Sequence, residues 1–312
     1  MKISYNFYKD HEKKSLVDLW SSVFNKSKKS SLNLIKWLIS NNAGDLYLAK
    51  DDEKNIIVGS RAGWIWKFKY NNLVLNSIQF GLTAVSKDYR RLGIFSKLNV
   101  NYINHLKSKN IDFIYNVSLP NAKKGYEKLG WIYCDGIYRI IRFRFYPIFN
   151  LKKNSFKICN NFNSDFFSTL KKLNIYLNSK KLIPIHDKNF IIKRLSHDVD
   201  FKIYFTDEII IIYKTKKQFG LKHIFVGEIF CDFKNPILLK KSIDNIQKIE
   251  KSFFINAYIT NSHPLFKIKH KIGLWSIISK SPLGIKIIND KKISLQEIQN
   301  HIILSYIDLD TF

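Results

Sequence analysis

The amino-acid sequence predicts a mixed α/β (α+β) protein, with a central sheet flanked by helices and a second, similar unit after it. Two observations lead to this prediction. The first half of the chain alternates strand-like and helix-like hydrophobic periodicity. A strand, turn, short helix, glycine and tryptophan then occur in that order once in each half. The 312 residues suffice for two cores, since domains cluster near ~100–150 residues.

The first half contains ten predicted elements, bounded by turn signals such as Asp-Asp-Glu-Lys-Asn. In chain order they are a strand at 2–7, helices at 13–24 and 30–42, strands at 45–51, 56–70 and 73–85, a helix at 93–110, a strand at 112–119, a short helix at 121–130 and a strand region at 131–145. Apolar residues recur at helical spacing in the helices, for example Ile94, Leu98, Ile103 and Leu106. These elements predict an N-terminal domain over residues 1–147.

An internal repeat supports the second unit. The segment Phe113–Trp131 can be laid over Phe253–Trp275, and each copy follows an amphipathic helix. Only the first copy has an Arg-Arg-Leu-Gly turn before that helix, whereas the second has Asp-Phe-Lys-Asn-Pro there. We therefore expect a polar connector over residues 148–187 and a degenerate second copy of the fold over residues 188–312.

The net charge of +27 admits two interpretations. Clustered Lys and Arg neutralise phosphates, so the charge could serve an anionic partner. An A/T-rich genome would also produce it, because Lys, Ile, Asn, Tyr and Phe are all abundant and the lysines are spread along the chain. We do not expect nucleic acid as the partner. Either way, the positive field would speed the encounter with a polyanionic cofactor.

Other function classes find no support. No stretch approaches the ~20 apolar residues of a membrane span, and the amino terminus lacks the apolar region of a secretory signal. The scattered Cys134, Cys159 and Cys231 argue against a disulfide framework or a cysteine metal site. The eight histidines lack metal-ligand spacing, so no metal is expected. The sequence indicates a cytoplasmic protein.

The stretch Val85–Leu98 predicts an anion site. A strand that enters a glycine-containing turn and then a helix leaves backbone N–H groups pointing outward at the positive end of the helix dipole. Arg90 and Arg91 would add charge suited to a diphosphate, and Gly93 would let the backbone approach the ligand. An ordinary surface turn with two solvated arginines is the alternative.

The same stretch resembles motif A of the GNAT superfamily of N-acetyltransferases, Arg/Gln-x-x-Gly-x-Gly/Ala, whose loop binds the pyrophosphate of acyl-CoA. Arg90 and Gly93 match the fixed positions, while Phe95 departs from the third, and the Gly-Ile-Phe version is similar to that of a subset of the superfamily. Downstream, Asn-Ala-Lys-Lys-Gly-Tyr-Glu-Lys-Leu-Gly-Trp resembles the family segment Asn…Tyr-x-x-x-Gly-aromatic. The resemblance covers residues 2–145 with specific motifs and the rest weakly, as a degenerate second GNAT-like half.

The resemblance implies a GNAT-type fold and direct transfer of an acyl group from acetyl-CoA, or another acyl-CoA, to an amine. The strand at 73–85 would splay from the strand at 112–119 to admit the pantetheine arm. Backbone groups near Leu82 would polarise the thioester carbonyl, and the arginine loop would hold the pyrophosphate. The implied cofactor-binding residues are Leu82, Thr83, Ala84, Val85, Arg90, Arg91, Leu92, Gly93, Ile94, Phe95, Ser96 and Asn121.

Tyr126 is the implied general acid, because a phenol is matched in basicity to the leaving thiolate. Its alternative role is to pack an amphipathic helix, and Asn121 could merely cap that helix. The general base is left open. The strand that often carries a glutamate in the family has Gln79, and the other candidates are His263, Asp308 and Asp310.

Three functions stay open at this point. The first is an N-acyltransferase for a small primary amine, with a nucleotide-linked amino sugar suggested by the Gly-Ile-Phe resemblance. The second is an aminoacyl-tRNA-dependent peptidyl ligase with a tandem fold, which would need no pyrophosphate loop. The third is a non-catalytic scaffold, favoured by Phe95 and the missing carboxylate. The acceptor, the acyl chain length and the oligomeric state are not indicated by the sequence.

Overall fold

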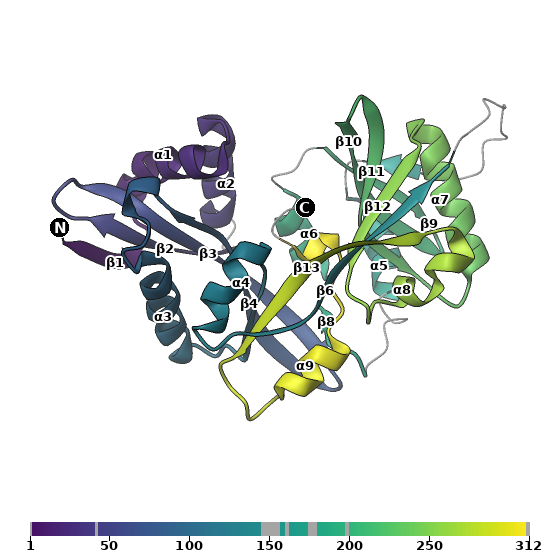
Figure 1. Ribbon diagram of the computed structural model, residues 1–312. Helices are drawn as coiled ribbons and strands as arrows, with labels where there is room; N and C mark the ends of the chain where they lie inside the picture. The colour runs from purple at the N-terminus through teal and green to yellow at the C-terminus, as the bar shows by residue number, and fades with distance from the viewer. Residues whose placement is uncertain are drawn as a thin grey trace. The chain divides into compact units, whose positions relative to one another are not determined.

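In the computed structural model, contacts divide the chain into two compact units (Figure 1). Unit 1 comprises Met1–Phe68, Val74–Cys134 and Pro282–Glu297, and unit 2 comprises Lys69–Leu73, Asp135–Ser281 and Ile298–Phe312. The structure describes residues 2–40, 43–144, 157–159, 162–173, 180–196 and 200–309, with the side chains of 40, 121, 157–159 and 276–280 left out.

Unit 1 is built mainly from the N-terminal elements. They are β1 (Ile3–Phe7), η1 (Asp10–Glu12), α1 (Lys13–Phe24), α2 (Lys28–Ser40), β2 (Gly44–Asp51), β3 (Ile56–Tyr70), β4 (Leu73–Val85), η2 (Lys87–Tyr89), α3 (Ile94–Lys107), β5 (Phe113–Val117) and α4 (Pro120–Glu127). Its strands follow the order β1-β2-β3-β4-β5, and the end of β13 (Trp275–Ile287) then pairs with β5.

β4 and β5 pair over a short stretch of the unit 1 sheet and then separate. These two strands are parallel, and they pair over three positions only, from Ser77 opposite Phe113 to Gln79 opposite Tyr115. β4 then continues to Val85 without this partner, while β5 pairs antiparallel with Leu283–Ile287 on its other edge. The two strands therefore part after Gln79, as the family resemblance implied.

Helices cover both faces of this sheet, with α1 and α2 on one face and α3 on the other (Figure 1). α3 buries Ile94, Leu98 and Tyr102 against the sheet. It approaches β3 closely because two glycines line its path. A Cβ on Gly59 would lie 2.8 Å from Ile94 Cγ2, and one on Gly63 would lie 2.4 Å from Tyr102 Oη.

Unit 2 contains the later elements. They are β7 (Lys157–Cys159), α5 (Ser164–Leu173), β8 (Ile183–Pro184), α6 (Lys188–Leu195), β9 (Phe201–Thr206), β10 (Ile209–Gln218), β11 (Leu221–Cys231), α7 (Pro236–Glu250), β12 (Phe254–Ile259), α8 (Pro264–Ile268), η4 (Lys269–Ile272) and η5 (Tyr306–Asp308). β6 (Ile132–Phe143) and α9 (Leu295–His301) have residues in both units. The strand order within the unit is β6-β12-β11-β10-β9-β7, with β11 and β12 parallel.

The run Ile209–Ile212 shows why the unit 2 sheet is buried on both faces. Alternate residues of a strand point to opposite faces. Ile209 and Ile211 accordingly pack in one cluster with Ile243 of α7, whereas Ile210 and Ile212 pack in another with residues of α5 and α6. A continuous apolar run is the pattern of a central strand with both faces covered.

The fold class is confirmed: a mixed sheet with helices on its faces, followed by a second unit of similar order. In each half a strand leads through a helix to a parallel strand, a short helix and a left-handed glycine before tryptophan, namely Gly130 (φ 74°) and Gly273 (φ 72°). The domain boundaries at residues 147 and 188 stay a prediction, and the predicted connector lies in part outside the described residues.

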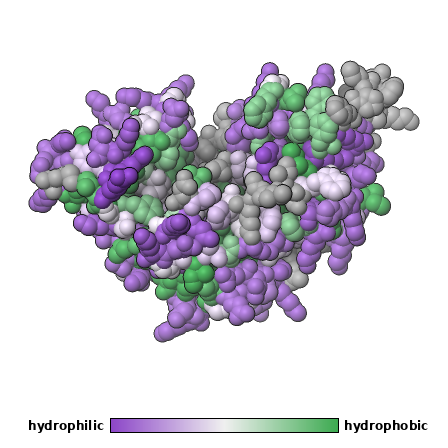
Figure 2. All heavy atoms as spheres, in the orientation of Figure 1, coloured by the Kyte–Doolittle hydropathy of each residue, from purple (hydrophilic) through white to green (hydrophobic). Residues whose placement is uncertain are grey.

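The visible surface is largely hydrophilic (Figure 2). Figure 2 shows hydrophilic residues across the visible face of both units, interspersed with apolar ones. Every helix within the described ranges is too short or too polar to cross a lipid bilayer.

Gly63→Ala tests the close packing of α3 on β3. We expect a loss of roughly 1–3 kcal/mol in the free energy of unfolding, because the new methyl group would overlap Tyr102 Oη. Chemical denaturation measures this loss. Tyr102→Phe is the matched second change, since the Tyr102 hydroxyl is buried without a hydrogen-bond partner among the described residues. The double variant should recover part of the loss, and a loss that Tyr102→Phe leaves unchanged would contradict this account.

Candidate active site

The N-terminus of α3 presents backbone N–H groups without a side-chain cap. Gly93 is the N-cap, with φ 75°, and no side chain among the described residues caps the first turn. The first backbone bond of the helix runs from Lys97 N–H to the Gly93 carbonyl at 3.0 Å. The amides of Ile94, Phe95 and Ser96 therefore precede the helical ladder and point outward at the positive end of the helix dipole.

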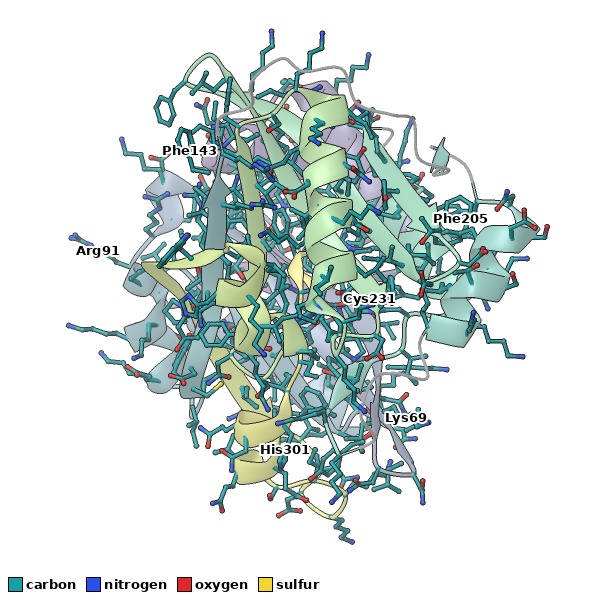
Figure 3. All side chains as sticks on the ribbon, turned by 90° about the vertical axis from the view of Figure 1, so that its right-hand side faces the viewer. Lys69, Arg91, Phe143, Phe205, Cys231 and His301 are labelled. Carbon is teal, nitrogen blue, oxygen red and sulfur yellow. The ribbon has the colours of Figure 1, made fainter. Side chains whose placement is uncertain are left out.

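The turn before α3 is exposed and positively charged. Arg90, Arg91, Leu92 and Gly93 are all exposed, and Arg91 has a left-handed backbone (φ 66°) that reverses the chain. Its side chain extends away from the ribbon in Figure 3. Neither arginine forms an ion pair with any of the described residues. Two unpaired guanidinium groups beside uncapped amides can bind a diphosphate.

The equivalent helix of unit 2 lacks these donors. In α7 the Asn235 side chain accepts the N–H of Leu238, and Pro236 at the first helical position has no N–H to offer. The two halves thus share a fold but differ in the chemistry of this helix start. The anion-binding geometry belongs to unit 1.

The end of β4 is irregular at the predicted cofactor segment. Leu82 has φ 44°, a conformation that a leucine adopts only when its surroundings impose it, and its carbonyl accepts a hydrogen bond from Ser60 Oγ at 3.4 Å. Ala84 is buried, and Thr83 and Val85 are half-buried. Because β4 has already left β5, this segment has a free edge toward β5 on which backbone groups can bind an extended ligand.

Tyr126 lies at this segment and is held by a buried arginine. Its hydroxyl accepts hydrogen bonds from Arg61 Nη2 at 2.6 Å and Nη1 at 3.1 Å, and it lies 3.5 Å from Thr83 Oγ1. Arg61 Nη1 also donates to Thr83 Oγ1 at 2.9 Å. Since the Tyr126 oxygen accepts twice, its own O–H is left to donate away from Arg61.

Phe95 packs on α4. Its ring meets the Tyr126 ring edge-on at 5.0 Å, and a Cβ on Gly125 would lie 3.1 Å from it. Trp131 contacts the Tyr126 ring at 5.2 Å. The aromatic residue at the third motif position therefore links the start of α3 to the helix that carries Tyr126.

The capping role considered for Asn121 is wrong. α4 begins at Pro120, with Leu119 as its N-cap, so Asn121 lies inside the first turn. Proline is favoured at the first helical position because its fixed φ suits the helix. The helix therefore begins at Pro120, one residue before the predicted start at Asn121. The Asn121 side chain lies outside the described residues.

Gln79 is 1% exposed, and neither of its amide atoms has a partner among the described residues.

The candidate bases from the C-terminal half lie in unit 2. His186 Nε2 and Asp308 Oδ1 are 2.6 Å apart, and His263 Nε2 lies 3.4 Å from Glu228 Oε1. Asp308 also accepts from Ser305 N–H and Oγ. All of these side chains are buried, and His186 Nδ1 lies 3.7 Å from Glu228 Oε2, so the Asp308–His186 and Glu228–His263 pairs form one buried cluster. Asp310 lies outside the described residues.

The pKa shifts in this cluster follow from its pairing. Burial alone would lower the pKa of His186, but the carboxylates of Asp308 and Glu228 outweigh it and raise the pKa overall. Burial would raise the pKa of Glu228, and its interactions with His263 and His186 lower it. His186, Glu228 and Asp308 offer atoms within 4.8 Å of one another. The 2.6 Å contact, however, is a hydrogen bond, shorter than the ~3.3 Å that separates two ligands of a tetrahedral zinc ion.

Sequence reasoning missed Arg61. It lies in the apolar run Ile56–Trp66 and is 0% exposed. A usable signal was present, because Gly59 and Gly63 share its face of the strand and leave room for a large side chain between them. Periodicity alone does not show that a lone arginine points inward.

His186→Gln tests the cluster. The folded-state pKa of His186 is raised above its unfolded value of ~6.5, so the imidazolium stabilises unit 2 below that pH. This contribution is lost as the pH rises through the folded-state pKa. We expect the difference in unfolding free energy between the wild type and His186→Gln to be largest below about pH 6.5 and to shrink toward pH 9. Denaturation across this range measures it, and a difference that grows with pH would refute the assignment.

Comparison with known proteins finds a family model that matches the N-terminal part of the chain. Residues 4–134 match the family model described as the acetyltransferase (GNAT) domain. No curated protein sequence matches the chain.

Solved structures share the fold across most of the chain. A probable N-acyltransferase from Enterococcus faecalis aligns with a TM-score of 0.67 and 12% identity, over 93% of this chain and 73% of that one. A putative acetyltransferase from Pyrococcus horikoshii aligns with a TM-score of 0.58 and 14% identity, over 97% and 95%. A fungal GCN5-related glucosamine N-acetyltransferase region, within a multi-domain β-N-acetylglucosaminidase, aligns with a TM-score of 0.58 and 14% identity, over 91% of this chain and 38% of that one.

At these identities the structural likeness concerns the fold, and the family-model match concerns residues 4–134. The matched domain contains the uncapped start of α3, the segment Leu82–Val85 and Tyr126. Residues 4–134 therefore match the acetyltransferase (GNAT) domain, and most of the chain shares its fold with solved acetyltransferase and N-acyltransferase structures.

Proposed function

We propose that the chain transfers an acetyl group from acetyl-CoA to the primary amine of a small molecule, by direct attack in a ternary complex. The observation that carries this proposal is the meeting of Thr83 and Tyr126, which come from separate motifs, at 3.5 Å. Next to them, Phe95 of the uncapped α3 start contacts the Tyr126 ring. A pyrophosphate site, an extended binding edge and a proton donor are thereby close together in unit 1.

The residues fit acetyl-CoA in three places. The amides of Ile94–Ser96, with Arg90 and Arg91, would bind the pyrophosphate. The free edge of β4 from Leu82 to Val85 would bind the amide groups of the pantetheine arm. A backbone N–H there would stabilise the oxyanion that develops on the thioester carbonyl. Holding both reactants in this way removes encounter entropy from the barrier.

Tyr126 would act as the general acid. The amine nitrogen bonds to the carbonyl carbon, the carbon–sulfur bond breaks, and the Tyr126 proton passes to the departing sulfur. The nitrogen loses its extra proton to water or to a base. With two N–H groups directed at its oxygen, the Tyr126 hydroxyl can donate to only one side, which supports this role.

We propose an amino sugar, free or nucleotide-linked, as the acceptor class to test first. The support is the glucosamine N-acetyltransferase region among the structural neighbours and the Gly-Ile-Phe loop. An aminoacyl-tRNA-dependent ligase would not need the exposed arginines beside the uncapped amides, so the geometry favours an acyl-CoA donor.

Gly93→Glu tests the cofactor site. The glutamate carboxylate would repel the pyrophosphate, and the backbone at this position would have to keep φ 75°, which residues with a Cβ rarely adopt. We expect acetyl-CoA to bind at least tenfold more weakly, as measured by titration calorimetry, because the lost contact exceeds ~1.4 kcal/mol. Gly220→Glu is the matched control, since Gly220 has φ 77°, equally open surroundings and a place in unit 2. Equal effects from both variants would exclude this site, and a wild type that does not bind would exclude the acyl-CoA function.

Tyr126→Phe tests the proton donor. Phenylalanine keeps the ring contacts with Phe95 and Trp131 but removes the transferable proton. We expect kcat to fall by about 10²-fold with little change in the dissociation constant of acetyl-CoA. Steady-state rates of thiol release measure kcat. A large loss of acetyl-CoA affinity with unchanged kcat would instead assign Tyr126 to binding.

A further inference from the structure

We propose that Arg61 is a positioning residue for acyl transfer: its buried guanidinium orients the Tyr126 hydroxyl and stabilises the phenolate left when Tyr126 gives up its proton. This inference rests on the proposed function. It adds a group that belongs to neither motif, since Arg61 lies on β3.

Arg61 is an isolated buried cation. Its side chain is 0% exposed, and no carboxylate among the described residues pairs with it. Its partners are Tyr126 Oη and Thr83 Oγ1, with the ring of Phe80 at 4.2 Å from the guanidinium carbon. The remaining donor, Nε, has no partner among the described residues.

A buried cation of this kind lowers the stability of the folded state. Removing a guanidinium from water without an anion destabilises a protein, and an apolar side chain of similar volume is often as good or better for stability. Burial lowers the pKa of Arg61, and the tyrosine hydroxyls, led by Tyr126, act in the opposite direction. An arginine nevertheless stays protonated in proteins. The folded state alone gives no reason for a charge here.

The proposed reaction supplies that reason. Before transfer, Arg61 faces a neutral phenol through two hydrogen bonds. When the carbon–sulfur bond breaks and the Tyr126 proton moves to sulfur, the phenol oxygen becomes an anion and the contact becomes an ion pair. Reprotonation by solvent restores the starting state. An interaction that strengthens as charge develops lowers the barrier, and its effect is larger in a buried site.

The geometry also explains the direction in which the Tyr126 O–H group points. Both nitrogens of the guanidinium fork reach Tyr126 Oη, at 2.6 and 3.1 Å, and one of them also reaches Thr83. The two N–H groups occupy the lone pairs of the phenol oxygen, so the O–H turns away from Arg61. Ile94 and Tyr102 of α3 pack against Gly59 and Gly63, which lie two residues before and after Arg61 on the same face of β3.

The experiment compares Arg61→Met, Arg61→Lys and the wild type, each with Tyr126 or with Tyr126→Phe. We expect Arg61→Met to lower kcat by about 10²-fold, with acetyl-CoA affinity within a factor of about three and an unchanged or higher thermal midpoint. The alkaline limb of the kcat profile should move to higher pH, and Arg61→Lys should restore part of the rate. In the Tyr126→Phe background, Arg61→Met should lower kcat little further, because the effects of residues that act as a unit are not additive.

A spectroscopic measurement tests the proposal without turnover. The ultraviolet phenolate signal of Tyr126 is the difference between each protein and its Tyr126→Phe partner. It should develop at higher pH in Arg61→Met than in the wild type. An unshifted phenolate signal, or equal losses of kcat with and without Tyr126, would overturn the role of Arg61. A wild type that binds no acetyl-CoA would instead refute the proposed function. The spectroscopic result would still show whether Arg61 stabilises the Tyr126 phenolate.

Discussion

The site of unit 1 depends on one constraint, the separation of β4 from β5 after Gln79. Every backbone polar group of a strand needs a partner, and a strand that leaves its neighbour has groups free to bind something else. β5 is occupied on its other edge by Leu283–Ile287. β4 instead continues through Leu82 to Val85, and the chain then passes through η2 and the arginine turn to the uncapped start of α3. The free edge of β4, the helix start and Tyr126 are near one another because the two strands part.

The two units share an order of strands and helices but differ in how their helix starts are capped and how their buried charges are paired. In unit 2, Asn235 and Pro236 cap α7. Its buried Glu250 is paired, because it accepts from Lys202, Lys222 and Tyr213. In unit 1, α3 is uncapped, and the hydrogen-bond partners of the buried Arg61 among the described residues are the hydroxyls of Thr83 and Tyr126. Paired groups stabilise a fold, whereas groups without a full set of partners are available to a ligand or to a reaction.

Local sequence patterns accounted for most of the elements of unit 1. The predicted strands at 56–70 and 73–85 agree with β3 and β4, and the predicted helix at 13–24 agrees with α1. The glycine turn at Gly93 and the place of Tyr126 on α4 also follow from local motifs. These features depend on residues close together in the chain, where periodicity, turn residues and caps act directly.

Thus the sequence by itself determined the order of strands and helices, the glycine turn before α3 and the helix that carries Tyr126. The tertiary structure alone decided that Leu283–Ile287 pairs with β5, that Arg61 points inward to Tyr126, and that Asp308 and His263 belong to a buried cluster. Strand partners and buried polar pairs join residues far apart in the chain. Their free energy depends on packing and burial, which a single sequence does not display, and local periodicity therefore cannot reveal them.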